Sequence, residues 1–259
     1  MEKNSPELWQ PFLPIPTLDG HKYDRGHAII LGASSLTGAT RLAASACSRM
    51  GAGLTTVISN QQASVYRLAL PADIMVRETI SNDIKKVSVL LAGPGGTNEE
   101  QRKLIANNPW QCPLVLDANA IPVEGNFAGL NDNCVLTPHE GEFEKAFGNF
   151  GKYRIEKTLE AAKLSGAIIL LKGMQSIIAS PDGRVVANDH ASPWLAKAGT
   201  GDVLAGMITG MIAQKMEPFW ATCAAVWMHG EAGRRIGPGL IASDIENELR
   251  FILKKIMEV

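Results

Sequence analysis

Short apolar runs alternate with longer helix-forming stretches along most of this chain, and that alternation limits the folds open to it. Runs at 28–32, 54–59 and 88–92 are rich in aliphatic residues and bounded by glycine or polar residues, which is typical of buried strands. Stretches that favour helices, such as 39–50 and 99–107, separate them. This order predicts an α/β fold with a mostly parallel central sheet, covered by helices on both faces.

The same alternation continues to the end of the sequence. Further strands are expected at 72–77, 114–117, 134–136 and 167–171, and further helices at 61–70, 142–147, 154–165, 202–212, 218–236 and 243–256. Two more strands, 176–180 and 184–187, flank Pro181-Asp182-Gly183, a signal for an antiparallel hairpin. The chain has no internal repeat and no linker between unlike halves. We therefore expect one domain over residues 1–259, with an irregular, proline-rich arm at 1–20 that could hold a short helix around Leu8–Gln10.

Composition excludes several classes of function. The chain has 259 residues, 46% of them hydrophobic, and a formal net charge of −1, so no electrostatic feature favours nucleic acid or an anionic membrane. No apolar run is long enough to cross a bilayer, and no secretory signal pattern begins the chain. The four cysteines lack zinc or disulfide spacing and favour a reducing compartment. We expect a cytoplasmic protein with no metal bound by a dedicated cluster of side chains.

The stretch 198–206 is the strongest candidate for a functional site. Gly199 and Gly201 lack a Cβ, so their amides can approach a ligand closely. The apolar run that follows predicts a buried helix, whose first turn leaves amides without partners and carries the positive end of the helix dipole. Gly199, Thr200 and Gly201 are therefore predicted to form an anion hole. Asp202 at its mouth is open to two interpretations, a helix cap or a base beside a phosphate.

Other unusual loops follow predicted strands and should meet at the same edge of the sheet. Ligands of open α/β sheets bind outside the carboxyl ends of the strands. These loops are Gly32–Gly38, Gly93–Thr97, Asp117–Asn119, Thr137–Glu142 and Lys172–Ser176. Lys172 follows an apolar run and is well placed for a phosphate, although a solvated surface lysine is the simpler alternative. His139 and Asn119 are likewise open to roles in their own loops.

Two common nucleotide-binding patterns are missing. The chain has no G-x-x-x-x-G-K-[ST] sequence, and Gly51-Ala52-Gly53 lacks the third glycine of a dinucleotide fingerprint and precedes a strand. The loop at 199–202 is therefore the leading candidate for a phosphate site.

With these motifs in view, the chain resembles the ribokinase superfamily, and within it the ADP/ATP-dependent NAD(P)H-hydrate dehydratases. Gly-Thr-Gly-Asp at the start of a helix carries the first resemblance, and Thr-Pro-His-x-Gly-Glu together with Ala-Gly-Thr-Gly-Asp-Val-Leu-Ala-Gly carries the second. The similar stretches are Lys22–His27, Gly38-Ala39, Arg49–Leu54, Gly93–Gly95, Leu116–Ala118, Leu136–Glu142, Leu171–Gly173, Ala198–Gly206, His229–Gly233 and Ala242–Asp244. The resemblance implies a ribokinase-like three-layer α/β/α sandwich.

The resemblance also implies an activity and its ligands. Hydrated NADH or NADPH would be phosphorylated on its ring hydroxyl by ADP or ATP with Mg²⁺, and phosphate would then be eliminated to restore NAD(P)H. Asp202 would be the general base. Lys172, Gly173, Met174, Gln175, Ser176 and Gly201 would bind the nucleotide, and Ala39, Gly95, His139 and Asp202 would face the hydrated cofactor. Asn119, where the family usually has Asp, is a further candidate, and the family's assembly is a homotetramer.

Two alternatives stay open. A small-molecule kinase of the same superfamily would share the Gly-Thr-Gly-Asp loop, although His139 and the Gly38-Ala39 helix favour the dehydratase. A nucleotide sensor without catalysis would share the fold but would gain nothing from a base at position 202.

Overall fold

The computed structural model describes residues 1–80, 84–123 and 125–257. Within them one mixed sheet forms from strands β1 (Glu2–Lys3), β2 (His27–Leu31), β3 (Leu54–Ile58), β4 (Met75–Arg77), β5 (Val87–Ala92), β6 (Leu114–Leu116), β7 (Cys134–Leu136), β8 (Ile168–Leu171), β9 (Ser176–Ala179) and β10 (Val185–Asn188). The helices are α1 (Pro6–Trp9), α2 (Thr37–Arg49), α3 (Ala63–Ala69), α4 (Glu99–Asn107), α5 (Glu140–Phe147), α6 (Arg154–Ser165), α7 (Thr200–Ala213), α8 (Pro218–Ile236) and α9 (Ala242–Ile256). Short 3₁₀ turns lie at Gln10–Phe12, Ala118–Ala120 and Pro193–Leu195.

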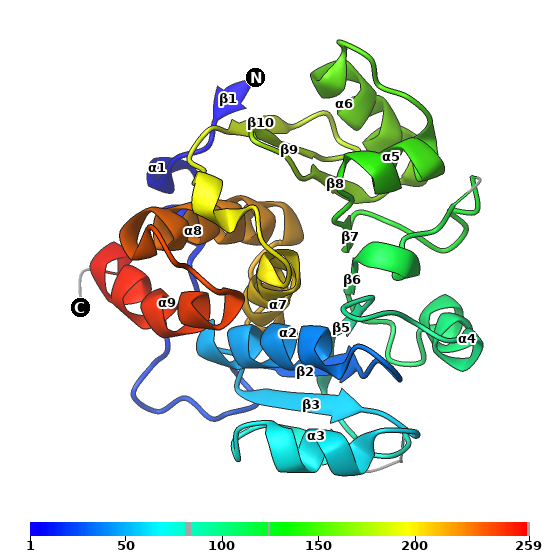
Figure 1. Ribbon diagram of the computed structural model, residues 1–259, viewed down its shortest axis with the longest axis vertical. Helices are drawn as coiled ribbons and strands as arrows, with labels where there is room; N and C mark the ends of the chain where they lie inside the picture. The colour runs from blue at the N-terminus through cyan, green and yellow to red at the C-terminus, as the bar shows by residue number, and fades with distance from the viewer. Residues whose placement is uncertain (81–83, 124, 258–259) are drawn as a thin grey trace.

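The order of strands across the sheet is β1-β10-β9-β8-β7-β6-β5-β2-β3-β4. Strands β2 to β8 pair in parallel, β9 is antiparallel to both β8 and β10, and β1 runs parallel to β10. Figure 1 shows α2, α7, α8 and α9 together on one side of the sheet and α4 on the other. The predicted α/β fold with a mostly parallel sheet and a late hairpin is confirmed.

Each face of the sheet packs against its own helices. Alternate residues of the central strands enter one core with α2, α7, α8 and α9, and the others enter a second core with α5 and α6. Helices α2 and α7 approach unusually closely, because a Cβ added at Gly206 would lie 2.1 Å from the Ala43 carbonyl oxygen. This close packing sets the height of α7 above the sheet, and with it the position of the loop that begins the helix.

Part of the N-terminal arm is joined to the sheet. β1 pairs with β10, and the Asn4 amide donates to Asn188 Oδ1 at 2.9 Å and to the Cys223 carbonyl at 2.8 Å. Trp9 is fully buried and donates to Asn4 Oδ1. No sequence pattern predicts β1, since a strand of two residues is too short to show alternation.

No helix in the described ranges is both long enough and apolar enough to span a bilayer.

Candidate active site

The order in which successive strands add to the sheet reverses between β2 and β5. Strands β3 and β4 extend the sheet from one side of β2, whereas β5, β6, β7 and β8 follow one another on its other side. In open α/β sheets, ligands bind outside the carboxyl ends of the strands at such a point. The loops after these strands therefore mark the edge at which a site is expected.

Helix α7 begins at this edge. Gly199 precedes it with a φ of 91°, a left-handed conformation that glycine adopts without strain. The first helical hydrogen bond runs from the Val203 amide to the Gly199 carbonyl at 3.1 Å, so the Gly201 and Asp202 amides have no acceptor within the helix. The Thr200 amide already lies 3.4 Å from the Lys197 carbonyl. The turn therefore offers chiefly the Gly201 and Asp202 amides to an anion.

A partly buried ion pair lies beside this turn. Lys172 Nζ is 2.8 Å from Asp117 Oδ1, which also accepts a hydrogen bond from Thr137 Oγ1 at 2.7 Å. The Asp117 side chain is 5% exposed and that of Lys172 is 20% exposed. A Cβ added at Gly201 would lie 3.6 Å from Lys172 Nζ, so the ammonium group faces the first turn of α7. Positive charge and free amides thus converge on one point.

Asp202 lies partly buried in the first turn of α7. Burial, together with the Asp117 carboxylate and against the opposing charge of Lys172, raises the pKa of its carboxyl group to about 6. Within the described part of the chain, the influences on this carboxylate are burial and the charges of Asp117 and Lys172, with no hydrogen bond among them. An ionised carboxyl group with a raised pKa is a competent base near neutral pH.

His139 lies next to Lys172 across an isolated parallel bridge between their backbones. Its Nδ1 accepts a hydrogen bond from the Glu142 amide at 3.2 Å, and the Glu142 carboxylate accepts one from the His139 amide at 2.9 Å. This reciprocal pair caps the N-terminus of α5. The His139 side chain is nevertheless 61% exposed at the same end of the sheet, with its Nε2 lying 3.3 Å from Glu142 Oε1.

The loop after β5 is braced from two sides. Asn119 Oδ1 accepts hydrogen bonds from the Thr97 amide at 2.8 Å and from the Thr97 hydroxyl at 3.0 Å. The Thr40 hydroxyl donates to the Pro94 carbonyl at 2.9 Å, which ties the start of α2, with Ala39, to Gly95. Asn119 therefore has a structural task here, that of holding the loop.

The loop 172–176 joins β8 to β9. The Ser176 hydroxyl lies 3.2 Å from the Gly173 carbonyl and closes the loop, while the side chain of Met174 is exposed. The Gln175 side-chain amide donates to Asp189 Oδ1 at 2.6 Å, and Arg154 Nη2 donates to the Gln175 backbone carbonyl at 3.4 Å. Backbone groups of this loop are thus fixed in place and accessible.

The structure brings most of the predicted site residues to one edge. Lys172, Gly201 and Asp202 lie together, and the loops that carry His139 and Gly95 follow strands β7 and β5 at the same edge. Sequence reasoning missed Asp117 as the partner of Lys172, Thr137 as a second donor to Asp117, and Arg154 as a contact of the 172–176 loop. The position of Asp117 at the end of a predicted buried strand was the one signal available for it.

Comparison with known proteins identifies the family. A family profile described as Carb_kinase, NAD(P)H-hydrate dehydratase, matches residues 27–248. An ADP-dependent (S)-NAD(P)H-hydrate dehydratase of Neisseria meningitidis is 30% identical over 261 residues, which cover 92% of this chain and 88% of the relative. A bifunctional NAD(P)H-hydrate repair enzyme of Moorella thermoacetica is 32% identical over 280 residues, covering 95% of this chain and 52% of the relative. The chain thus spans about half the length of the bifunctional relatives that it matches.

Solved structures show the same fold. The ADP/ATP-dependent NAD(P)H-hydrate dehydratase of Bacillus subtilis, co-crystallised with ATP and Mg²⁺, superposes with a TM-score of 0.86 at 27% identity over 98% of both chains. An Arabidopsis thaliana ribokinase superposes with a TM-score of 0.61 at 10% identity over 88% of this chain and 99% of the ribokinase, a likeness of fold alone. The matched family profile covers most of the chain and includes every loop of the site, and the chain therefore belongs to the Carb_kinase family of NAD(P)H-hydrate dehydratases.

Proposed function

We propose that this chain catalyses the nucleotide-dependent dehydration of hydrated NADH or NADPH back to NAD(P)H, a cofactor repair reaction. One observation carries the proposal within the family: Asp202, with a pKa of about 6, lies in a turn that offers two free amides and faces the Lys172 ammonium group. A base, an anion hole and a fixed positive charge are the parts that phosphoryl transfer to a hydroxyl group requires.

In this mechanism Asp202 removes the proton from the ring hydroxyl of the hydrated cofactor. The hydroxyl oxygen bonds to the terminal phosphorus of the nucleotide, and the bond from that phosphorus to the nucleotide's bridging oxygen breaks. The amides of Gly201 and Asp202, and the Lys172 ammonium group, stabilise the charge on the transferring group. The new phosphate ester then leaves the ring as inorganic phosphate, and a proton is lost from the neighbouring carbon as the double bond is restored.

The remaining residues divide between the two substrates. Lys172, Gly173, Met174, Gln175 and Ser176 bind the adenine nucleotide, mainly through the backbone, because Met174 points to solvent and Ser176 closes the loop. In turn, Ala39, Gly95 and His139 face the hydrated cofactor. Asn119 supports that side indirectly, through its hydrogen bonds to Thr97.

The carboxylates at this edge fit a Mg²⁺ ion carried by the nucleotide. No cluster of three or more His, Cys, Asp or Glu side chains suited to a metal occurs within the described residues. Mg²⁺ usually keeps several waters and takes one or two protein carboxylates plus substrate phosphates, so no such cluster is required. Asp117 and Asp202 are the carboxylates placed to meet it, and when bound the ion would neutralise charge on the phosphates.

The proposal also covers the oligomeric state of the protein and its cellular compartment. The family resemblance supports a homotetramer. Four free, buried cysteines support a reducing, cytoplasmic environment.

One assay tests the reaction. The protein is incubated with hydrated NADH and either ATP or ADP in the presence of Mg²⁺, and the absorbance of NADH is followed. We expect NADH to form only when the nucleotide is present, with one phosphate released for each NADH. A stable phosphorylated product without NADH would instead indicate a kinase, and nucleotide binding without turnover would indicate a sensor.

A further inference from the structure

His229 is a buried imidazole on α8 that the proposed reaction does not use. Its Nε2 lies 2.9 Å from the carbonyl oxygen of Thr200, the first residue of α7. Because a carbonyl oxygen can only accept, Nε2 carries the proton and donates. Burial lowers the pKa of His229 to about 4, so the imidazole is neutral near pH 7 and this contact is a hydrogen bond without net charge.

The carbonyl of Thr200 and the amide of Gly201 belong to one peptide group. That group is planar and trans, so its C=O and N–H bonds point in opposite directions. A donor that holds the carbonyl toward α8 therefore holds the Gly201 N–H away from α8, toward the open end of α7. The Gly201 amide is one of the two free donors in this turn.

This peptide group begins α7, where the helix supplies one restraint on the Thr200 carbonyl and His229 supplies a second. Glycine at positions 199 and 201 leaves the backbone on both sides of Thr200 free to adopt conformations closed to other residues. A rotation of the peptide would withdraw the Gly201 N–H from a bound anion. A hydrogen bond accepted by the carbonyl opposes that rotation and also polarises the N–H, which strengthens it as a donor.

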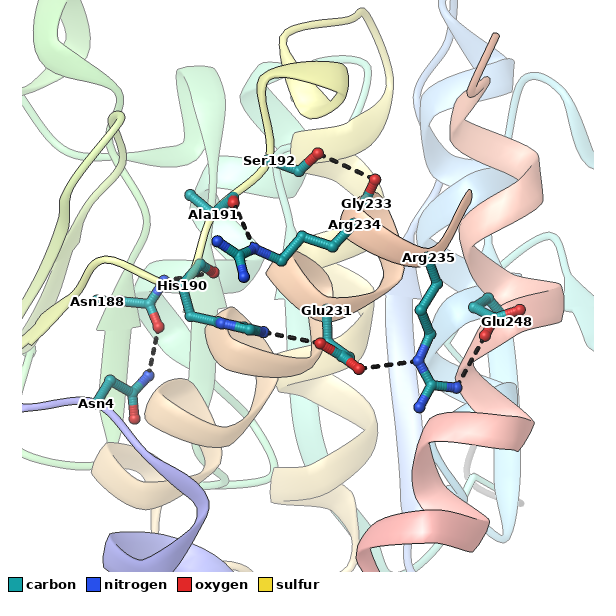
Figure 2. Close-up of polar contacts among 10 residues, drawn as sticks. All are labelled: Asn4, Asn188, His190, Ala191, Ser192, Glu231, Gly233, Arg234, Arg235 and Glu248. Atoms are coloured by element: carbon teal, nitrogen blue, oxygen red, sulfur yellow. Dashed lines mark hydrogen bonds and ion pairs between the residues drawn. The ribbon is translucent and has the colours of Figure 1, made fainter. Parts of the chain in front are cut away.

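The position of α8 is itself held by the segment that precedes the glycine loop (Figure 2). His190 Nε2 lies 2.9 Å from Glu231, which also accepts a hydrogen bond from Arg235. The Ser192 hydroxyl donates to the Gly233 carbonyl at 3.0 Å. A Cβ added at Gly230 would lie 1.7 Å from the His190 carbonyl oxygen, so the helix and the segment touch through their backbones.

We propose that His229 is a positioning residue that aims the Gly201 amide at the transferring phosphoryl group. The contacts of α8 with residues 190–192 keep the imidazole within reach of the Thr200 carbonyl. The identity of the anion rests on the proposed function, whereas the orientation of the peptide does not.

A matched pair of variants isolates the donor. His229→Gln places a nitrogen donor the same number of bonds from the backbone, and His229→Met places a methyl group there. We expect His229→Met to lower kcat about 10- to 100-fold, somewhat less than the loss of an anion-hole donor itself, with KM for the hydrated cofactor changed less than about threefold. His229→Gln should recover most of kcat. Thr222→Val, which removes a buried hydroxyl elsewhere on α8, should lower Tm without lowering kcat.

Two readouts do not depend on turnover. In the nucleotide-free protein, the NMR resonance of the Gly201 amide should move in His229→Met and stay near its wild-type position in His229→Gln. By calorimetry, His229→Met should lose several-fold in affinity for ATP and little for AMP, which lacks the terminal phosphate. If His229→Met does not fold, His229→Asn replaces it, because its amide is one bond too short to reach Thr200.

The outcomes separate this inference from the proposed function. An unmoved Gly201 resonance in His229→Met, or a His229→Gln protein that folds well yet loses as much kcat as His229→Met, would overturn the positioning role. Wild-type protein that forms no NADH, combined with the expected movement of the Gly201 resonance, would overturn the proposed reaction and leave the positioning role supported.

Discussion

Lys172 Nζ lies 2.8 Å from Asp117 Oδ1, and the pair faces the first turn of α7. Thr137 donates a further hydrogen bond to the same carboxylate oxygen, so the ammonium group is held in place before any anion binds. The two charges act on Asp202 in opposite directions, since Asp117 raises the pKa of its carboxyl group and Lys172 lowers it.

This arrangement predicts opposite pH effects from two substitutions. If ionised Asp202 is the base, kcat/KM of the wild type should rise with pH through about 6. Lys172→Met removes a charge that favours the ionised form, so the acidic limb should move to higher pH. Asp117→Asn removes a charge that disfavours it, so the limb should move to lower pH. The measurement is kcat/KM of each variant between pH 4 and 9.

A surface lysine supplies the control for net charge. Lys157→Met on α6 removes a lysine charge from an exposed pair with Glu160 and should leave the acidic limb of the kcat/KM profile at its wild-type pH. Movement of both site variants in the same direction would show that another group controls the profile.

Elements whose ends carry local signals could be predicted from the sequence alone. Helix α4 begins after Asn98, whose side chain forms a capping box with Gln101. Helix α6 ends at Gly166, which adopts the left-handed conformation, and α8 begins with Pro218 at its first position. These signals lie within a few residues of the boundaries that they set. The expected bounds of all three helices match the structure.

Contacts between residues far apart in sequence could not be predicted in this way. Asp117 pairs with a lysine 55 positions away, and His229 contacts a carbonyl 29 positions away. Such partners depend on the order of strands across the sheet, which local patterns do not encode. The sequence therefore indicated Lys172, Gly201 and Asp202 as site residues but not the groups that position or tune them.

Substitution by alanine should have different effects on activity and stability at two glycines of α7. A Cβ at Gly201 would meet only Lys172 Nζ, at 3.6 Å, which is an ordinary contact. Gly201→Ala should therefore fold with an unchanged or slightly raised Tm, yet lose activity by about 10²-fold or more, because the methyl group faces the anion site. Kinetic assays and thermal unfolding measure the two effects separately.

Gly206→Ala is the matched comparison. Its Cβ would overlap the Ala43 carbonyl, so α2 and α7 would have to separate. We expect a loss of about 1–3 kcal/mol in the free energy of unfolding. If Gly201→Ala kept full activity, the phosphate would not approach this amide.

Substitution of His139 should weaken the binding of hydrated NADH more than the binding of ATP. Because its side chain also caps α5, alanine would remove a cap and an imidazole together. His139→Asn keeps a capping side chain and removes only the imidazole, since Asn is among the best capping residues. We expect His139→Asn to raise KM for hydrated NADH several-fold while the Kd for ATP, measured by calorimetry, stays within about twofold. Equal losses for both ligands, or for neither, would restore a purely structural role.

Asp202→Asn should stabilise the protein while it lowers turnover by about 10²-fold or more. The folded carboxyl group has a pKa of about 6, raised from an ordinary 3.8, so between these values the folded state binds more protons than the unfolded state. The free energy of unfolding therefore falls as pH rises from about 4 to 6, and the full cost of the ionised group is present at pH 7. Asn removes that cost, a gain on the order of 1–2 kcal/mol at pH 7 that should vanish below about pH 4. Urea unfolding at pH 4 and pH 7 measures the gain.

The same substitution decides between the two interpretations of Asp202. Gly199, not Asp202, is the N-cap of α7, and no side chain caps it, so a purely structural Asp202 would only sit in the first turn, where Asn would serve as well and activity would survive. As the base, Asp202 cannot be replaced by a side chain that takes no proton, and turnover should fall by about 10² or more while nucleotide affinity stays close to that of the wild type. A more stable protein with intact ATP binding and lost turnover would identify a carboxylate kept for chemistry at the expense of stability. A fully active Asp202→Asn protein would place the base elsewhere, and the raised pKa would then reflect only the burial of Asp202 and its nearness to Asp117.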